Sequence, residues 1–204
     1  MKKYTFEEKN LELAQEKALY ELGLSKENII INSVQEKNNL LKKSVIIEVV
    51  LLKDVIDYLK DSLNEILTLM NIKANLEVRV RENRIEIKIF SDKNAILIGK
   101  NGKNVQAMQT ILKQILRNQI KEKDNIYVTL DVEDYKEKRI RNLEYLAKRV
   151  AREVAKTKVE TKLDSMNSYE RRAIHNALTD DKYVYTVSEG EEPNRYVIIK
   201  PREK

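Results

Sequence analysis

Ile98-Gly99-Lys100-Asn101-Gly102-Lys103 decides how the middle of this 204-residue chain folds, because it holds two of the chain's four glycines within four residues. Glycines at both ends of the GxxG permit unusual backbone angles and let a phosphodiester backbone approach without a Cβ clash. A helix starting after the loop would offer unpaired N–H groups to phosphate, and two lysines add charge. Taken alone, a GxxG loop also fits an ordinary turn between two helices. Its spacing matches neither a P-loop nor a dinucleotide-binding loop.

The segments around this loop alternate between helical and strand patterns. We expect, in order, helix 55–70, strands 76–80 and 85–89 with a turn at 81–83, the apolar run 95–98, helix 103–119 and strand 126–132. The order α-β-β-α-GxxG-α-β matches a KH module, in which the loop clamps about four nucleotides of single-stranded RNA. We therefore expect a backbone-binding site made of Ile98, Gly99, Lys100, Asn101, Gly102 and Lys103.

Beyond the KH-like segment, a strongly basic helix is expected from Tyr135 to about Lys156. Residues 135–158 contain nine basic and three acidic residues, so they account for the whole net charge of +6. On a helical wheel one arc of about 100° carries cations and no carboxylate, and the opposite side is apolar. This arc contains Lys138, Arg141, Tyr145, Lys148, Arg149, Arg152 and Lys156. Nucleic-acid contact, membrane-surface binding and simple solubility remain open, and the first is favoured.

The C-terminal segment carries the chain's one histidine on a short expected helix, 168–178. Arg171 and His175 are four residues apart and so share a helix face, with Arg172 adjacent. A lone histidine is more often structural, but Arg-x-x-x-His also defines the R-three-H module, which binds single-stranded nucleic acid. A strand at 159–163 and a hairpin pairing 183–187 with 196–199 complete the expected unit. The tyrosines at 169, 183 and 185 are candidates for base stacking, and a core or hydrogen-bonding role for each remains open.

The first 52 residues show one helix over a small sheet and no recognisable chemistry. We expect a helix at 7–22 that stops at Gly23, strands at 29–34 and 45–52, and a polar loop at 35–43.

Composition excludes several classes of protein. With no cysteine and one histidine, the chain cannot build a thiolate or multi-histidine metal site, and we expect neither a metal nor a cofactor. No convergent set of nucleophile, base and orienting acid is apparent, so we expect a non-catalytic protein. No apolar run reaches the roughly 18 residues of a membrane span, which predicts a cytoplasmic location.

The whole chain resembles the bacterial Jag/KhpB (SpoIIIJ-associated) family. The resemblance rests on residues 98–103, on 165–175 (SMNSYERRAIH) and on 190–196 (GEEPNRY). It implies an α+β protein of three small domains in series: a Jag-N domain at 1–52, a type II KH domain at 53–134 and an R-three-H domain at 135–204. It further implies cytoplasmic single-stranded RNA binding and post-transcriptional control of cell-envelope growth and division. A small KH-only partner protein and a link to a YidC-type membrane insertase are also implied, and self-association is left open.

This chain departs from the family's pattern in three places. The turn between the Jag-N strands often contains glycines, whereas residues 37–43 here have none, so the role of that turn is open. The proline often found before the R-three-H tyrosine is Ser168, which we expect to cap the helix. The connection between the Jag-N and KH segments is short. The alternative function is a scaffold whose KH and R-three-H surfaces bind protein partners.

Overall fold

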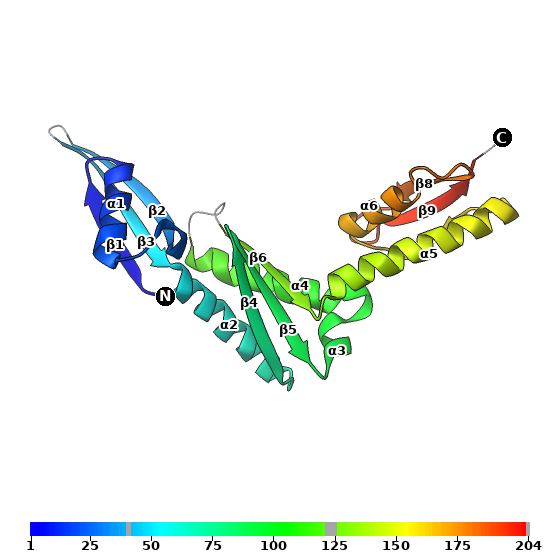
Figure 1. Ribbon diagram of the computed structural model, residues 1–204, viewed down its shortest axis with the longest axis horizontal. Coiled ribbons are helices and arrows are strands. Elements are labelled where there is room, and N and C mark those ends of the chain that lie inside the picture. The colour runs from blue at the N-terminus through cyan, green and yellow to red at the C-terminus, as the bar shows by residue number, and fades with distance from the viewer. Residues whose placement is uncertain (40–41, 121–125, 203–204) are drawn as a thin grey trace. The chain divides into compact units, whose positions relative to one another are not determined.

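The computed structural model describes residues 1–39, 42–120 and 126–202, which form two compact units, Met1–Glu133 and Asp134–Lys204. Each sheet is small, three-stranded and accompanied by helices, which confirms the expected α+β class (Figure 1). Whether the first unit divides into two domains near residue 52 stays a prediction. In this unit β3 (Lys42–Leu51) passes directly into α2 (Leu52–Leu69).

The N-terminal sheet has the strand order β1-β3-β2 and is covered by one helix. Its other elements are β1 (Lys3–Glu8), α1 (Leu11–Leu22) and β2 (Ile29–Asn39). The expected helix start at residue 7 is wrong. Tyr4 and Phe6 alternate inward on a strand, and the helix begins only after Asn10, whose side chain accepts a hydrogen bond from the Leu13 N–H at 2.8 Å. The predicted stop is confirmed, since Gly23 is left-handed with φ 63°.

The expected polar loop at 35–43 is also wrong over the described residues. β2 and β3 continue as an antiparallel ladder, with the pairs Lys37↔Ser44, Asn38↔Lys43 and Asn39↔Lys42. The sequence does not reveal these pairs because backbone hydrogen bonds hold the ladder, and a run of polar residues contains no hydrophobic alternation. Leu40 and Leu41, the remaining part of that prediction, lie outside the described residues.

The second half of the first unit has the predicted order of elements. After α2 come β4 (Ala74–Arg81), β5 (Arg84–Ser91), α3 (Asn94–Ile98), α4 (Lys103–Gln119) and β6 (Tyr127–Val132). The sheet order is β4-β5-β6, with β4 antiparallel and β6 parallel to the central strand. One face of the sheet is apolar and buried beneath the helices, as the full burial of Ile87 and Leu130 shows. α3 follows directly after the end of β5, so the connection from α3 to α4 lies near that end of the sheet (Figure 1).

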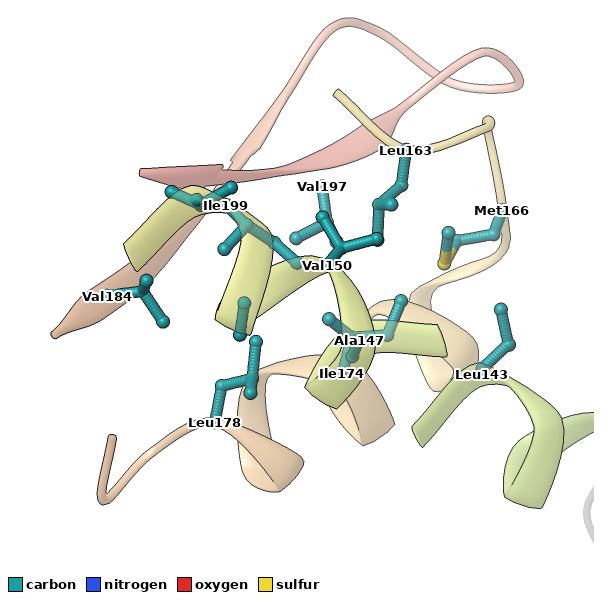
Figure 2. Packing of buried hydrophobic residues seen from close by; sticks show 12 residues of the cluster. Leu143, Ala147, Val150, Leu163, Met166, Ile174, Leu178, Val184, Val197 and Ile199 are labelled. Carbon is teal, nitrogen blue, oxygen red and sulfur yellow. The ribbon is translucent and has the colours of Figure 1, made fainter. Parts of the chain in front are cut away.

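The second unit is built around the long helix α5 (Tyr135–Thr157). Its other elements are β7 (Thr161–Lys162), α6 (Ser168–Ala177), β8 (Val184–Glu189) and β9 (Tyr196–Pro201), in the sheet order β7-β9-β8. The expected strand at 159–163 is thus reduced to two residues, and the hairpin is longer than expected. Figure 2 shows Ala147 and Val150 of α5 packed with Ile174 of α6 and Ile199 of β9. This core fixes which side chains of α5 and α6 remain available to solvent.

Candidate nucleic-acid interface

The glycine loop joins two helices through a sharp, left-handed turn. α3 ends at Ile98, and the Gly99 N–H donates to the Ala95 carbonyl at 2.9 Å. Gly99, Asn101 and Gly102 all have positive φ, at 68°, 55° and 77°. Gly99 has ψ −178°, a combination that is essentially restricted to glycine. No side chain caps α4, so its first-turn N–H groups are not taken up by a side-chain acceptor at the cap position.

Asn104 locks this loop in place. A Cβ added at Gly99 would lie 2.5 Å from the Asn104 Cγ, so the side chain occupies the space that glycine leaves. The Asn104 amide in turn donates to the Ile96 carbonyl at 2.7 Å and ties α4 back to α3. Sequence reasoning missed Asn104, because nothing in its spacing indicates that it packs against a glycine. The loop is consequently pre-shaped before any ligand binds.

The two lysines of the loop are directed to solvent. Lys100 and Lys103 are exposed, Ile98 and Asn101 are partly exposed, and Gly102 is buried. Ile96, on the helix before the loop, is 52% exposed, so an apolar surface lies next to the charged turn. Positive charge and apolar surface therefore occur side by side at the end of α3.

The cations of the basic helix lie on the exposed side of α5. This group comprises Lys138, Arg141, Lys148, Arg149, Arg152 and Lys156, all of which are exposed, together with Tyr145. Two features qualify the expectation of a face without carboxylates. Glu137 lies just outside the predicted arc, yet it forms an ion pair with Arg141. Asp180 and Asp181 line a shallow pocket of about 350 Å³ together with Lys148 and Arg152.

Arg171 is turned into the protein. Its side chain is 9% exposed; Nη1 donates to the Met166 carbonyl at 2.8 Å, and Nη2 lies 2.8 Å from Glu192 Oε1. The guanidinium thus holds the segment before α6 and the turn between β8 and β9. Arg172, the next residue, is exposed. Of these two arginines, only Arg172 has its charge directed to solvent.

His175 bridges α6 and β8 by accepting and donating hydrogen bonds with two hydroxyl groups. Its Nδ1 is 2.5 Å from Thr186 Oγ1, and its Nε2 is 2.8 Å from Ser188 Oγ. Burial lowers the pKa of His175, and the nearby Arg171 charge lowers it further. A neutral imidazole with both nitrogens engaged is a structural bridge. Thr186 and Ser188 were missed, although their period-two spacing places them on one face of the strand.

Segment 167–170 fixes the start of α6. The N-cap is Asn167 and not Ser168, which corrects the expected cap. Asn167 Oδ1 accepts from the Glu170 N–H at 3.0 Å, and Glu170 Oε2 accepts from the Asn167 N–H at 3.1 Å, which completes a capping box. Arg139 on α5 donates to Glu170 Oε1 at 2.9 Å. The start of α6 is thereby attached to the basic helix.

The second unit, which carries the exposed cations of α5 and Arg172, also has four exposed tyrosines. Tyr145, Tyr169 and Tyr183 are 71%, 69% and 63% exposed, and Tyr185 is 40% exposed. Their ring faces are available for stacking on bases. Over residues 1–39, 42–120 and 126–202, no group of histidine and carboxylate side chains is arranged to hold a metal ion. Within the same ranges, no helix combines the length and apolarity needed to cross a bilayer.

Comparison with protein families identifies two segments of the chain. Residues 56–130 match the KH domain of the KhpA/KhpB family, and residues 141–201 match the R-three-H domain. The two matches contain the glycine loop and the Arg171–His175 pair, respectively.

Two relatives match nearly the full chain, and a third matches a part of it. RNA-binding protein KhpB of Clostridium symbiosum is 36% identical over 197 residues, which covers 94% of this chain and 88% of the relative. RNA-binding protein KhpB of Bacillus subtilis is 32% identical over 206 residues, which covers 98% of each chain. RNA-binding protein KhpB of Lactiplantibacillus plantarum is 35% identical over 130 residues, or 64% of this chain and 40% of the relative.

Proposed function

The chain belongs to the KhpB family, and from this membership we propose that it is a non-catalytic protein that binds single-stranded RNA. The observation that carries the proposal is the glycine loop. Its backbone is held in a glycine-only conformation by Asn104, and Lys100 and Lys103 are exposed at its surface. In KH modules a GxxG loop clamps about four nucleotides through their backbone, and here the two exposed lysines supply charge for its phosphates.

We assign different roles to the predicted contact residues. Lys100, Asn101 and Lys103 bind phosphates, and Ile98 with the exposed Ile96 supplies apolar surface beneath the bases. In the second unit Arg172, Lys138, Lys148, Arg149, Arg152 and Lys156 extend the electrostatic contact. Arg171 and His175, which are engaged inside the protein, position the surface and do not themselves reach the RNA. Phosphate contacts of this kind give affinity with little sequence preference.

The biological setting follows from the family resemblance and is part of the proposal. We propose that the protein acts in the cytoplasm as a post-transcriptional regulator linked to cell-envelope growth and division. A small KH-only protein is the proposed partner, and a YidC-type insertase is the proposed functional link. The proposed domains are 1–52, 53–134 and 135–204. Co-purification from cells with and without RNase treatment tests whether the partner is held directly or through RNA.

Fluorescence anisotropy with a labelled single-stranded RNA over a salt series tests the central proposal. The test variant is Lys100→Asp/Asn101→Asp, which retains both glycines and places two carboxylates at the phosphate site. The matched control is Lys53→Asp/Asn64→Asp, which makes the same two substitutions at exposed positions of α2. We expect the wild type and the control to bind with a steep salt dependence, and the loop variant to lose most of the affinity.

The alternative scaffold function predicts the opposite pattern. RNA retention would then be weak for every variant, and a protein complex would be insensitive to salt. Absence of wild-type RNA binding at low salt would overturn the proposed function.

A further inference from the structure

The KH sheet has a second face, which the helices leave uncovered. Ile85, Ile87 and Ile89 of β5 are buried on the helix side, so the intervening residues of the same strand point the other way. We call this other side the open face. It is formed by alternate residues of β4, β5 and β6, and the strand register places them in rows across the sheet.

One row of the open face has an unusual composition. Arg81 of β4 pairs with Arg84 of β5, which in turn pairs with Tyr127 of β6. With strands about 4.8 Å apart, the three side chains form a row about 10 Å long. All three are exposed, Tyr127 by 59%. Within the described residues no carboxylate forms an ion pair with either guanidinium.

Two like charges directly opposite each other weaken a strand pair. The neighbouring rows avoid this cost. In the next row Arg79 lies opposite Glu86, and in the row after that Glu77 lies opposite Lys88. Glu82 follows Arg81 in the hairpin turn, and no second acidic residue joins it there. The open face therefore alternates in charge along its length and becomes cationic only at the row that contains the tyrosine.

We propose that Arg81, Arg84 and Tyr127 form an additional contact for single-stranded nucleic acid, separate from the glycine loop. Tyr127 stacks on a base while the two guanidinium groups bind the flanking phosphates, a combination that suits an anionic chain of planar bases. The inference rests on the proposed RNA-binding function and adds a second contact on the KH segment.

The row and the glycine loop lie at opposite ends of the sheet. β5 starts at Arg84 and runs eight residues to Ser91 before α3 and the loop follow. An eight-residue strand spans about 25 Å. A four-nucleotide segment held at the loop does not reach the row, so the row affects only longer RNA.

The test compares a labelled five-nucleotide uridine RNA with a twenty-nucleotide one by anisotropy over a salt series. In Arg81→Gln/Arg84→Gln, the salt slope for the long RNA falls by about 1.4, or about 0.7 for each of two lost phosphate contacts. Tyr127→Leu weakens binding of the long RNA about fivefold, which corresponds to the lower end of base stacking. Neither variant changes binding of the short RNA. All three positions are exposed, and far-UV circular dichroism verifies folding.

Arg79→Gln is the matched control, because it removes a guanidinium from the adjacent row, where Glu86 stands opposite. We expect it to change the salt slope much less than loss of Arg81 or Arg84. A fall of about 0.7 in Arg79→Gln, half of that in the double variant, would mean that the effect depends on charge alone and would overturn the site. A wild-type response in the double variant, combined with loss of binding in Lys100→Asp/Asn101→Asp, overturns this inference and leaves the proposed function intact. If the wild type binds neither RNA, the proposed function itself fails.

Discussion

Arg171 Nη2 lies 2.8 Å from Glu192 Oε1, so an arginine of α6 is held by the turn that connects β8 and β9. The same guanidinium donates to the Met166 carbonyl at 2.8 Å. One side chain therefore joins the segment just before α6 to the turn between β8 and β9, which follows 21 residues later. The contacts of Arg171 are therefore those of a residue that holds the second unit together.

Replacing Arg171 is expected to reduce stability more than RNA affinity. Arg171→Met leaves the Met166 carbonyl without its donor and removes the ion pair, which costs about 2 kcal/mol of unfolding free energy. Glu192→Gln costs less than about 1 kcal/mol, since Glu192 is 59% exposed and solvent screens its charge. Urea unfolding compares the two variants. In a fully folded Arg171→Met protein, a loss of RNA affinity that exceeds the loss of unfolding free energy would contradict this prediction and favour a direct contact with RNA.

The cap of α6 offers a direct comparison of adjacent residues. Asn167→Ala removes the acceptor for the Glu170 N–H and should cost about 1 kcal/mol of unfolding free energy. Ser168→Ala should be nearly neutral, because Ser168 is the first helical residue and makes no capping bond. Thermal unfolding of both variants measures the two losses of stability. An equal loss of stability would contradict the capping geometry.

Alanine substitutions at Gly99 and Gly23 compare two positions with positive φ: at Gly99 the new Cβ would also clash with a side chain, and at Gly23 it would not. Gly99→Ala forces alanine into a glycine-only conformation and pushes Asn104 off the Ile96 carbonyl, for an expected cost of about 3 kcal/mol. Gly23→Ala meets nothing within 4 Å and occupies an ordinary left-handed region, so it should cost about 1 kcal/mol. Chemical denaturation measures both. Only the first variant should also weaken RNA binding.

The single histidine makes the pH dependence of stability accessible. Because burial lowers the His175 pKa below 6.5, the unfolded state binds more protons in the interval between the folded pKa and 6.5. Stability from this group is therefore complete above pH 6.5 and is lost as the pH falls toward the folded pKa.

Proton NMR gives the folded pKa directly, since the chain has one imidazole resonance to follow. His175→Gln should abolish the stability slope just below pH 6.5. A folded pKa above 6.5 would contradict the buried bridge to Thr186 and Ser188.

Two arginines of the basic helix should differ in their contribution to RNA binding. Arg149→Gln should lower the salt slope by about 0.7 if Arg149 neutralises one phosphate. Arg141→Gln should lower it less, because Glu137 already pairs with that guanidinium. Anisotropy titrations at several salt concentrations provide the comparison. The prediction fails if both variants reduce the slope equally.

The sequence alone predicted the arrangement of the KH segment, and the reason is physical. In β4 and β5 apolar and polar residues alternate, and in α4 the apolar residues recur at helical spacing. Because each element buries one face, this spacing is visible in the sequence. The glycine loop was equally visible, since positive φ at Gly99 and Gly102 requires the residue type that marks it. The amphipathic helix α5 was predicted within one residue of its observed end.

Only the tertiary structure decided what the polar side chains contact. Arg171 and Arg172 are adjacent and chemically alike, yet Glu192, 21 residues after Arg171, meets one of them and leaves the other in solvent. Likewise, Asn104 fills the space over Gly99, and Glu137 reaches Arg141 from outside the predicted arc. Local periodicity reports which face of an element is buried, whereas the partner of a polar group depends on which distant segment the fold brings opposite it.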